Sequence, residues 1–117
     1  MILKTPSEIA LMRENGHKLD LIKKELKKMI VPGAIPLEID KVAEKLIKDA
    51  GGKPSFKMVK DYKFATCINI NDGVVHGIPN KRPLEEGDIV SLDIGMFYKG
   101  FHSDSAFTVP VGEITNK

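Results

Sequence analysis

The sequence lacks tryptophan, contains a single cysteine and has no long uninterrupted apolar run. One cysteine, Cys67, excludes an internal disulfide framework and fits a reducing compartment. A membrane-spanning helix would need about 18 or more consecutive apolar residues, which this chain does not contain. Because nothing after Met1 resembles the apolar core of a signal peptide, we expect a cytoplasmic protein with no membrane partner.

Neither sign of charge is in large excess. Lysine and arginine total 18 residues and aspartate and glutamate total 16, for a net charge of +2. Such a balanced surface has no electrostatic drive toward nucleic acid, so no specific nucleic-acid partner is expected. The 117 residues are 42% hydrophobic, which is enough to bury a core. We therefore predict one domain over residues 1–117.

A long amphipathic helix is predicted near the N-terminus. It begins at a capping box, with Thr5 as the N-cap, Pro6 at the first helical position and Glu8 three residues after the cap. Gly16 falls on its apolar stripe and is expected to let another element approach closely. The stripe recurs at spacings of three and four residues, typical of one buried helix face: Ile9, Met12, Leu19, Ile22, Leu26 and Met29.

The rest of the chain predicts a second helix followed by strands. The helix covers residues 37–50 and ends at Gly51, where a left-handed C-cap is wanted. Beyond Pro54 the apolar period changes to two, which indicates strands. The predicted strands are 55–59, 65–70, 88–98 and 101–111, with a hairpin turn at 71–73. This order predicts an α+β fold, with two N-terminal helices packed on an antiparallel sheet.

Two aspartates stand inside the last predicted hairpin. With residues 99–100 as a two-residue loop, Asp93 lies opposite Ala106 and Asp104 lies opposite Gly95. Cross-strand partners share a face, so the two aspartates become diagonal neighbours, with Cα atoms roughly 7 to 8 Å apart. Carboxylates at that separation could hold one divalent cation, or two cations about 3.5 to 4 Å apart.

On these residues alone, other interpretations of the aspartates stay open. Strand aspartates can simply face water, and a three-residue turn would place the pair on opposite faces. Apolar residues occur on both faces of this strand pair, so both faces are expected to be partly buried. Aspartate is depleted in strands and costly when buried without a partner, which favours a metal or catalytic role.

Two histidines flank the aspartates in the sequence. His102 shares the predicted face with Asp93 and Asp104, which makes it an equally good ligand candidate. His76 follows a predicted strand and precedes the rigid loop 77–79, where a strand fixes a side chain and a loop gives access to it. An isolated histidine at such a position also fits a plain structural role.

Three longer segments resemble type I methionine aminopeptidases, the enzymes that remove the initiator methionine from nascent proteins. They read SEIALMRENG, CININDGVVHGIPN and GDIVSLDIGMFYKGFHSDSAFTVPVG, and the resemblance runs from about Thr5 to Val111. The motif VVHGIP followed by both aspartates at their spacing is more specific than any single match. The resemblance implies that this chain is the N-terminal half of a pita-bread fold.

The resemblance also implies a metal site. In that family the equivalents of Asp93 and Asp104 chelate and bridge two divalent ions, which can be cobalt, manganese, iron or zinc. It gives no support to His102 as a ligand. The second half of such a fold supplies a further histidine and two glutamates, which do not follow in these 117 residues. We therefore expect weak or absent metal binding and negligible peptidase activity from the isolated chain.

The resemblance assigns the substrate contacts as well. It implies that His76 hydrogen-bonds the substrate near the scissile peptide, and that Tyr62 and Cys67 line the pocket for the methionine side chain. The expected substrates are therefore N-terminal Met peptides of nascent proteins. The alternative is a catalytically inactive pita-bread relative that binds protein or nucleic acid. Retention of His76 together with Asp93 and Asp104 argues against that alternative.

Half of a pseudo-symmetric sheet would expose an apolar face and an edge strand. Both features favour association with another chain. We therefore expect a homodimer in which a second copy stands in place of the missing half.

Overall fold

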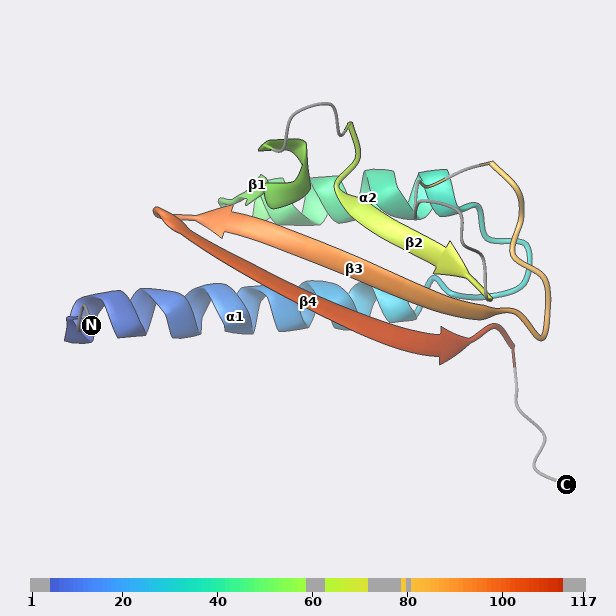
Figure 1. The fold of residues 1–117 in the computed structure, drawn as a ribbon, viewed down its shortest axis with the longest axis horizontal. Helices are drawn as coiled ribbons and strands as arrows, with labels where there is room; N and C mark the ends of the chain where they lie inside the picture. Colours follow the sequence, from blue (N-terminus) through green and yellow to red (C-terminus); the bar gives the residue numbers. More distant parts are fainter. Residues whose placement is uncertain (1–4, 59–62, 72–78, 80, 113–117) are drawn as a thin grey trace, which may run out of the picture.

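The computed structural model describes residues 5–58, 63–71, 79 and 81–112. Two helices, α1 (Pro6–Lys27) and α2 (Pro36–Asp49), lie on one side of an antiparallel sheet, which confirms the predicted α+β class (Figure 1). The sheet contains β1 (Lys53–Pro54), β2 (Thr66–Ile70), β3 (Ile89–Tyr98) and β4 (Phe101–Pro110). Within the described ranges, no helix is both long enough and apolar enough to cross a membrane.

Helix α1 starts as predicted. Leu19, Ile22 and Leu26 of its predicted stripe are buried, whereas Ile9 and Met12 are exposed. The Thr5 hydroxyl accepts a hydrogen bond from the Glu8 N–H, and the Glu8 carboxylate accepts one from the Thr5 N–H. The expectation for Gly16 was wrong, because a Cβ there would meet nothing within 4 Å. Asn15 occupies the gap in the apolar stripe and is 1% exposed. The buried positions of the helix are Asn15, Leu19, Ile22 and Leu26.

Asn15 joins α1 to the hairpin tip. Its side-chain amide donates to the Phe101 carbonyl over 3.0 Å, and its Oδ1 accepts from the Ser103 hydroxyl over 2.8 Å. A buried amide needs such partners, since burying a polar group without them costs free energy. One residue of α1 therefore fixes the helix against the start of β4.

The β3–β4 hairpin has the predicted register. Asp93 pairs with Ala106 and Gly95 pairs with Asp104, with Tyr98 and Phe101 closing the hairpin. The loop residues both have left-handed backbones, with φ of 48° at Lys99 and 88° at Gly100. Positive φ at both loop positions is the type I′ turn, which matches the twist of paired strands. The two-residue loop is therefore confirmed, and with it the shared face of the aspartates.

The predicted strand over residues 55–59 was wrong. Residues 55–58 form a short 3₁₀ helix, η1 (Ser55–Met58). Pro54 pairs with Met96 and Thr66 pairs with Ile94, so both β1 and β2 use the same edge of β3 and only Gly95 separates them. The chain between β1 and β2 must therefore leave the sheet, whatever its local apolar pattern.

Two other predicted local features have mixed outcomes. Gly51 is left-handed, with φ of 89°, and its N–H donates to the Lys48 carbonyl, so the C-cap of α2 is confirmed. The predicted hairpin turn at 71–73 is described only at Asn71, which has φ of 58°. The remainder of that turn lies outside the described residues.

The core lies between the helices and the even-numbered face of β3. It is formed by apolar side chains of both helices and of the sheet, among them Leu19, Leu26, Ile39, Ile47, Val90, Leu92, Ile94 and Met96. Because neighbouring residues of a strand point to opposite faces, this packing directs the odd-numbered residues of β3 away from both helices.

Candidate metal centre

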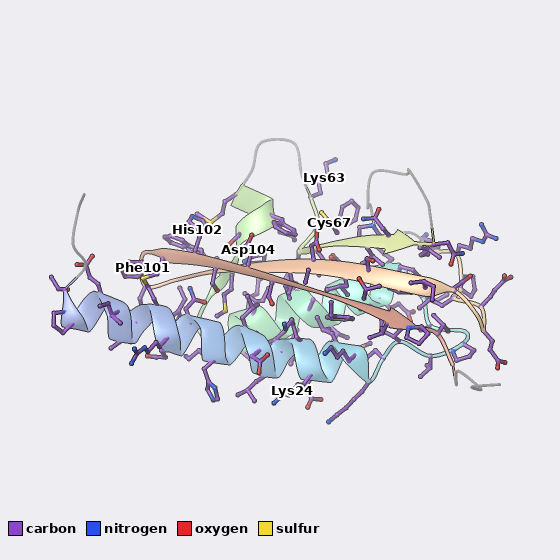
Figure 2. All side chains as sticks on the ribbon, turned by 60° about the horizontal axis from the view of Figure 1, so that its bottom comes forward. Lys24, Lys63, Cys67, Phe101, His102 and Asp104 are labelled. Carbon is purple, nitrogen blue, oxygen red and sulfur yellow. The ribbon has the colours of Figure 1, made fainter. Side chains whose placement is uncertain are left out.

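Asp93 and Asp104 project from the face of the sheet that the helices leave open. Both are exposed, and Ile89 on the same face is 42% exposed. The expectation that both faces would be partly buried is therefore wrong for this part of the hairpin, since α1 and α2 cover the same side. Figure 2 shows Asp104 on the side of the sheet away from α1. The aspartates thus incur little desolvation cost in this chain.

The two carboxylates share a hollow in that face. An open pocket of about 280 Å³ is lined by four residues of the β3–β4 hairpin, Asp93, Asp104, Ser105 and Ala106, together with Phe56 of η1. Carboxylate oxygens are ligands that hard divalent cations accept. The pair therefore fits a metal as part of a ligand set. Among the residues described, no group of three or more His, Cys, Asp and Glu side chains is gathered to complete that set.

His102 contacts Ser55 and Phe97 on the open face. Its Nδ1 lies 3.0 Å from the Ser55 hydroxyl, and its ring packs on Phe97 with the centroids 4.5 Å apart. Although it shares the open face, it does not join the two aspartates in a metal-holding group of described residues. That His102 is no metal ligand stays a prediction from the resemblance. Sequence reasoning did not identify Ser55 as its partner.

Cys67 lies beside the aspartates. It pairs with Asp93 across β2 and β3, and cross-strand partners project from the same face. Cys67, Asp93 and Ala106 therefore form one row across three strands. The thiol is half-buried, and Figure 2 places Cys67 on the same side of the sheet as Asp104. A small, half-buried residue next to the carboxylates suits a pocket wall.

The other two predicted site residues cannot be placed. Tyr62 and His76 both lie outside the described residues. Their expected contacts with the substrate remain predictions from the resemblance.

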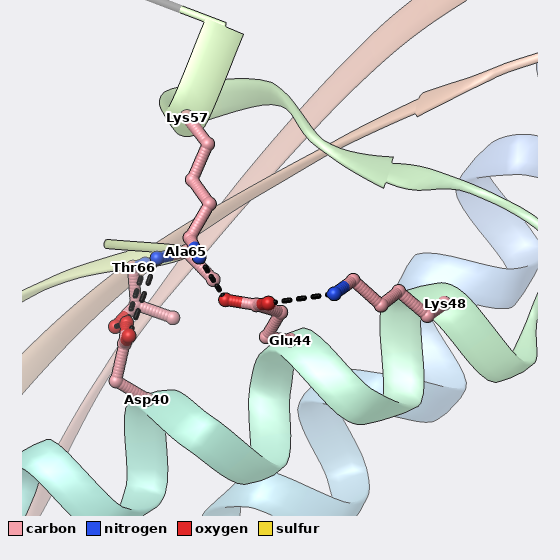
Figure 3. A network of polar contacts seen from close by, with 6 residues as sticks. All are labelled: Asp40, Glu44, Lys48, Lys57, Ala65 and Thr66. Carbon is pink, nitrogen blue, oxygen red and sulfur yellow. Dashed lines mark hydrogen bonds and ion pairs between the residues drawn. The ribbon is translucent and has the colours of Figure 1, made fainter. Parts of the chain in front are cut away.

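Asp40 is a polar residue of this region that the sequence analysis missed. It is 4% exposed, and its carboxylate accepts from the Ala65 N–H over 3.3 Å, from the Thr66 N–H over 2.8 Å and from the Thr66 hydroxyl (Figure 3). A signal was present in the sequence. Asp40 stands three residues before Ala43, on the apolar stripe of α2, where a carboxylate requires bonded partners.

Glu44, one turn further along α2, is the centre of a small ion-pair network. Its carboxylate contacts Lys48 over 2.8 Å and also contacts Lys57 of η1 (Figure 3). Hydrogen bonds from Lys48 and then from Lys57 hold the pKa of Glu44 below its ordinary value. The network ties η1, whose Phe56 lines the hollow, to α2.

A second polar cluster fixes the far end of β2. The Asn71 side chain donates to Asp88 over 3.1 Å and accepts from the Ile89 N–H over 2.8 Å. The Glu85 N–H donates to Asp88, and this bond together with the one from Asn71 lowers the pKa of the Asp88 carboxyl. Polar side chains thus fasten β2 at both of its ends.

Known proteins share this arrangement over most of the chain. Methionine aminopeptidase 1 of Bacillus subtilis is 47% identical over 116 residues, which are 99% of this chain and 47% of that protein. Methionine aminopeptidase of Clostridium perfringens is 42% identical over 117 residues, covering 100% of this chain and 47% of that protein. The chain thus spans about half the length of the curated relatives it matches.

Solved structures agree. Methionine aminopeptidase of Thermotoga maritima superimposes with a TM-score of 0.89 at 40% identity, covering 98% of this chain and 47% of that one. Prolidase of Pyrococcus furiosus gives a TM-score of 0.77 at 27% identity, and the match covers 92% of this chain and 32% of that one. These matches confirm the predicted fold, half of a pita-bread. The model of metallopeptidase family M24 matches residues 10–117, and the chain therefore belongs to that family.

Proposed function

We propose that this chain is the N-terminal, aspartate-bearing half of a cytoplasmic methionine aminopeptidase, which removes N-terminal methionine from nascent proteins. The observation that carries the proposal is the exposure of Asp93 and Asp104 together in one hollow of the open face. Similarity to methionine aminopeptidases over nearly all of the chain supports the substrate class.

The two aspartates would hold the divalent ions of the site. When bound, such ions lower the pKa of a coordinated water and polarise a carbonyl group. Asp93 and Asp104 stand on adjacent strands whose register is fixed by a tight turn, so their backbone positions are set before any metal arrives. Cobalt, manganese, iron and zinc all accept carboxylate ligands.

The row beside the aspartates would receive the substrate. Cys67 stands next to Asp93 and would form part of the wall against the methionine side chain, together with Tyr62. His76 would hydrogen-bond the peptide near the bond that is cleaved. Both roles come from the family resemblance. An inactive binding module is the less favoured alternative, because it has no need for two carboxylates on one face.

The isolated chain would be incomplete. Two carboxylates leave a divalent ion without enough protein ligands to hold it tightly. The open face and the outer edge of β4, which among the described strands pairs only with β3, would favour a homodimer in which a second copy covers the site. A monomer in sedimentation at high concentration, with and without metal, would count against that assembly.

Calorimetric titration with Mn²⁺ or Co²⁺ tests the proposal. We expect weak binding that Asp93→Asn or Asp104→Asn each abolishes. Glu25→Gln is the matched control, since Glu25 is an exposed carboxylate on α1, across the sheet from the hollow. Binding that survives both aspartate substitutions would refute the metal site. Turnover of a Met-Ala-Ser peptide by the isolated chain, at the rate of a full-length aminopeptidase, would refute its incompleteness.

A further inference from the structure

Strand β2 places Cys67 on the open face, beside Asp93 of the candidate site. It is five residues long and pairs with β3 so that Cys67 lies opposite Asp93. A small lateral or rotational shift of so short a strand would move the thiol relative to the carboxylate. The position of Cys67 therefore depends on what fastens the ends of β2.

The start of β2 is fastened by Asp40 of α2. One carboxylate oxygen of Asp40 accepts from both the N–H and the hydroxyl of Thr66, and the other accepts from the Ala65 N–H. Thr66 immediately precedes Cys67 and is 0% exposed. Bonds from one buried carboxylate to consecutive residues fix both the position and the rotation of the backbone at that point. These bonds link residues 25 and 26 positions apart in the sequence.

The same helix also holds another wall of the hollow. Glu44 binds Lys57 of η1, and the neighbouring Phe56 lines the hollow with the aspartates. Figure 3 shows Asp40 and Glu44 on successive turns of α2, each directed at a different segment. Helix α2 thus supports the site from behind the sheet, with the buried carboxylate acting on the strand that carries Cys67.

We propose that Asp40 is a positioning residue of the candidate site: it anchors the start of β2 and so holds Cys67 beside Asp93. The importance of Cys67 as a pocket wall rests on the proposed function, whereas the anchoring itself does not. Asp40 does not line the hollow in the described structure, so its effect passes through its hydrogen bonds to Ala65 and Thr66.

The test follows the accessibility of Cys67, the single cysteine, by its alkylation rate with iodoacetamide. Asp40→Asn keeps one acceptor but presents an amide N–H₂ to a donor, and we expect it to speed alkylation about tenfold, as expected when a local hydrogen bond is lost. Asp40→Ala removes every acceptor and should speed it further. Thr66→Val removes only the hydroxyl bond and should have a smaller effect.

The matched control separates positioning from general destabilisation. Ile22→Val shortens a buried side chain of α1, 5% exposed, and Ile22→Ala shortens it further. The Ile22 variant that matches Asp40→Asn in free energy of unfolding should alter the alkylation rate less than about twofold. Exposure of Cys67 requires only local opening of β2, which a substitution in α1 does not promote. Equal rates in Asp40→Asn and its matched control would overturn the proposal. If Asp40→Ala does not fold, Asp40→Asn and Thr66→Val still decide the matter.

Metal titration distinguishes this inference from the proposed function. The Asp40→Asn chain should bind Mn²⁺ as the unaltered chain does, within about threefold, because Asp93 and Asp104 are positioned by the β3–β4 hairpin. Mn²⁺ binding by the unaltered chain that survives both Asp93→Asn and Asp104→Asn would refute the proposed metal site and leave the anchoring standing. Normal Mn²⁺ binding with unchanged Cys67 alkylation in Asp40→Asn would refute the anchoring alone.

Discussion

Asn15→Ala would test whether α1 holds the hairpin that carries Asp104. The substitution removes the hydrogen bonds to the Phe101 carbonyl and from the Ser103 hydroxyl, at 3.0 and 2.8 Å. Each bond contributes about 0.5 to 1.5 kcal/mol net, so their joint loss should cost about 1 to 3 kcal/mol. Alanine is the better helix former, which offsets roughly half a kcal/mol of that cost. We expect the free energy of unfolding to fall by about 0.5 to 2.5 kcal/mol.

Urea unfolding followed by far-UV circular dichroism measures this change. Ser103→Ala provides the second arm of a double-mutant cycle, because it removes only the bond to Asn15 Oδ1 and should cost about 1 kcal/mol. In Asn15→Ala the hydroxyl has already lost that partner, so the two costs should not add, and the coupling should be near 1 kcal/mol. A cost of Asn15→Ala below about 0.5 kcal/mol, or additive single effects, would refute the role assigned to Asn15.

Two further predictions concern the helices. Gly16→Ala should raise the free energy of unfolding by about 0.5 to 1 kcal/mol, because the new methyl group meets nothing within 4 Å and alanine favours the helix. Thermal unfolding measures this change. A lower stability of the variant would show that another element does approach Gly16 closely. The pKa of Glu44 in the folded protein lies below its ordinary 4.5. Its contribution to the free energy of unfolding is therefore present above that pH, and it is lost as the pH falls through the pKa of the folded state. Glu44→Gln should therefore cost less than about 1 kcal/mol at neutral pH, and this difference should shrink below about pH 4.5 in acid unfolding curves; a constant difference would contradict the assignment.

The site was most predictable where it depends on local rules. A two-residue turn at Lys99 and Gly100 fixes the register of β3 and β4, and the register decides which face each aspartate occupies. Strand periodicity and turn chemistry are properties of neighbouring residues, so the sequence contained what was needed. The shared face of Asp93 and Asp104 follows from those local rules alone.

The errors came from contacts between distant segments. Residues 55–58 alternate like a strand, but the same edge of β3 is occupied by Thr66 one position beyond Gly95, which no local pattern reveals. Asp40 lies on the apolar stripe of α2, and its partners lie 25 and 26 residues further along the chain. The period of the helix could have marked a carboxylate at this position as anomalous. It could not identify which N–H groups would satisfy it.

The open face changes the reason for assigning a metal to the aspartates. Aspartates inside a strand favoured a metal because buried carboxylates are costly, yet Asp93 and Asp104 are exposed in this chain. Their substitution by asparagine should therefore leave the free energy of unfolding nearly unchanged while removing metal binding. Asp40 should behave in the opposite way, because its carboxylate is buried and satisfied by backbone donors. Metal binding and fold stability thus depend on different carboxylates, placed on opposite sides of one sheet.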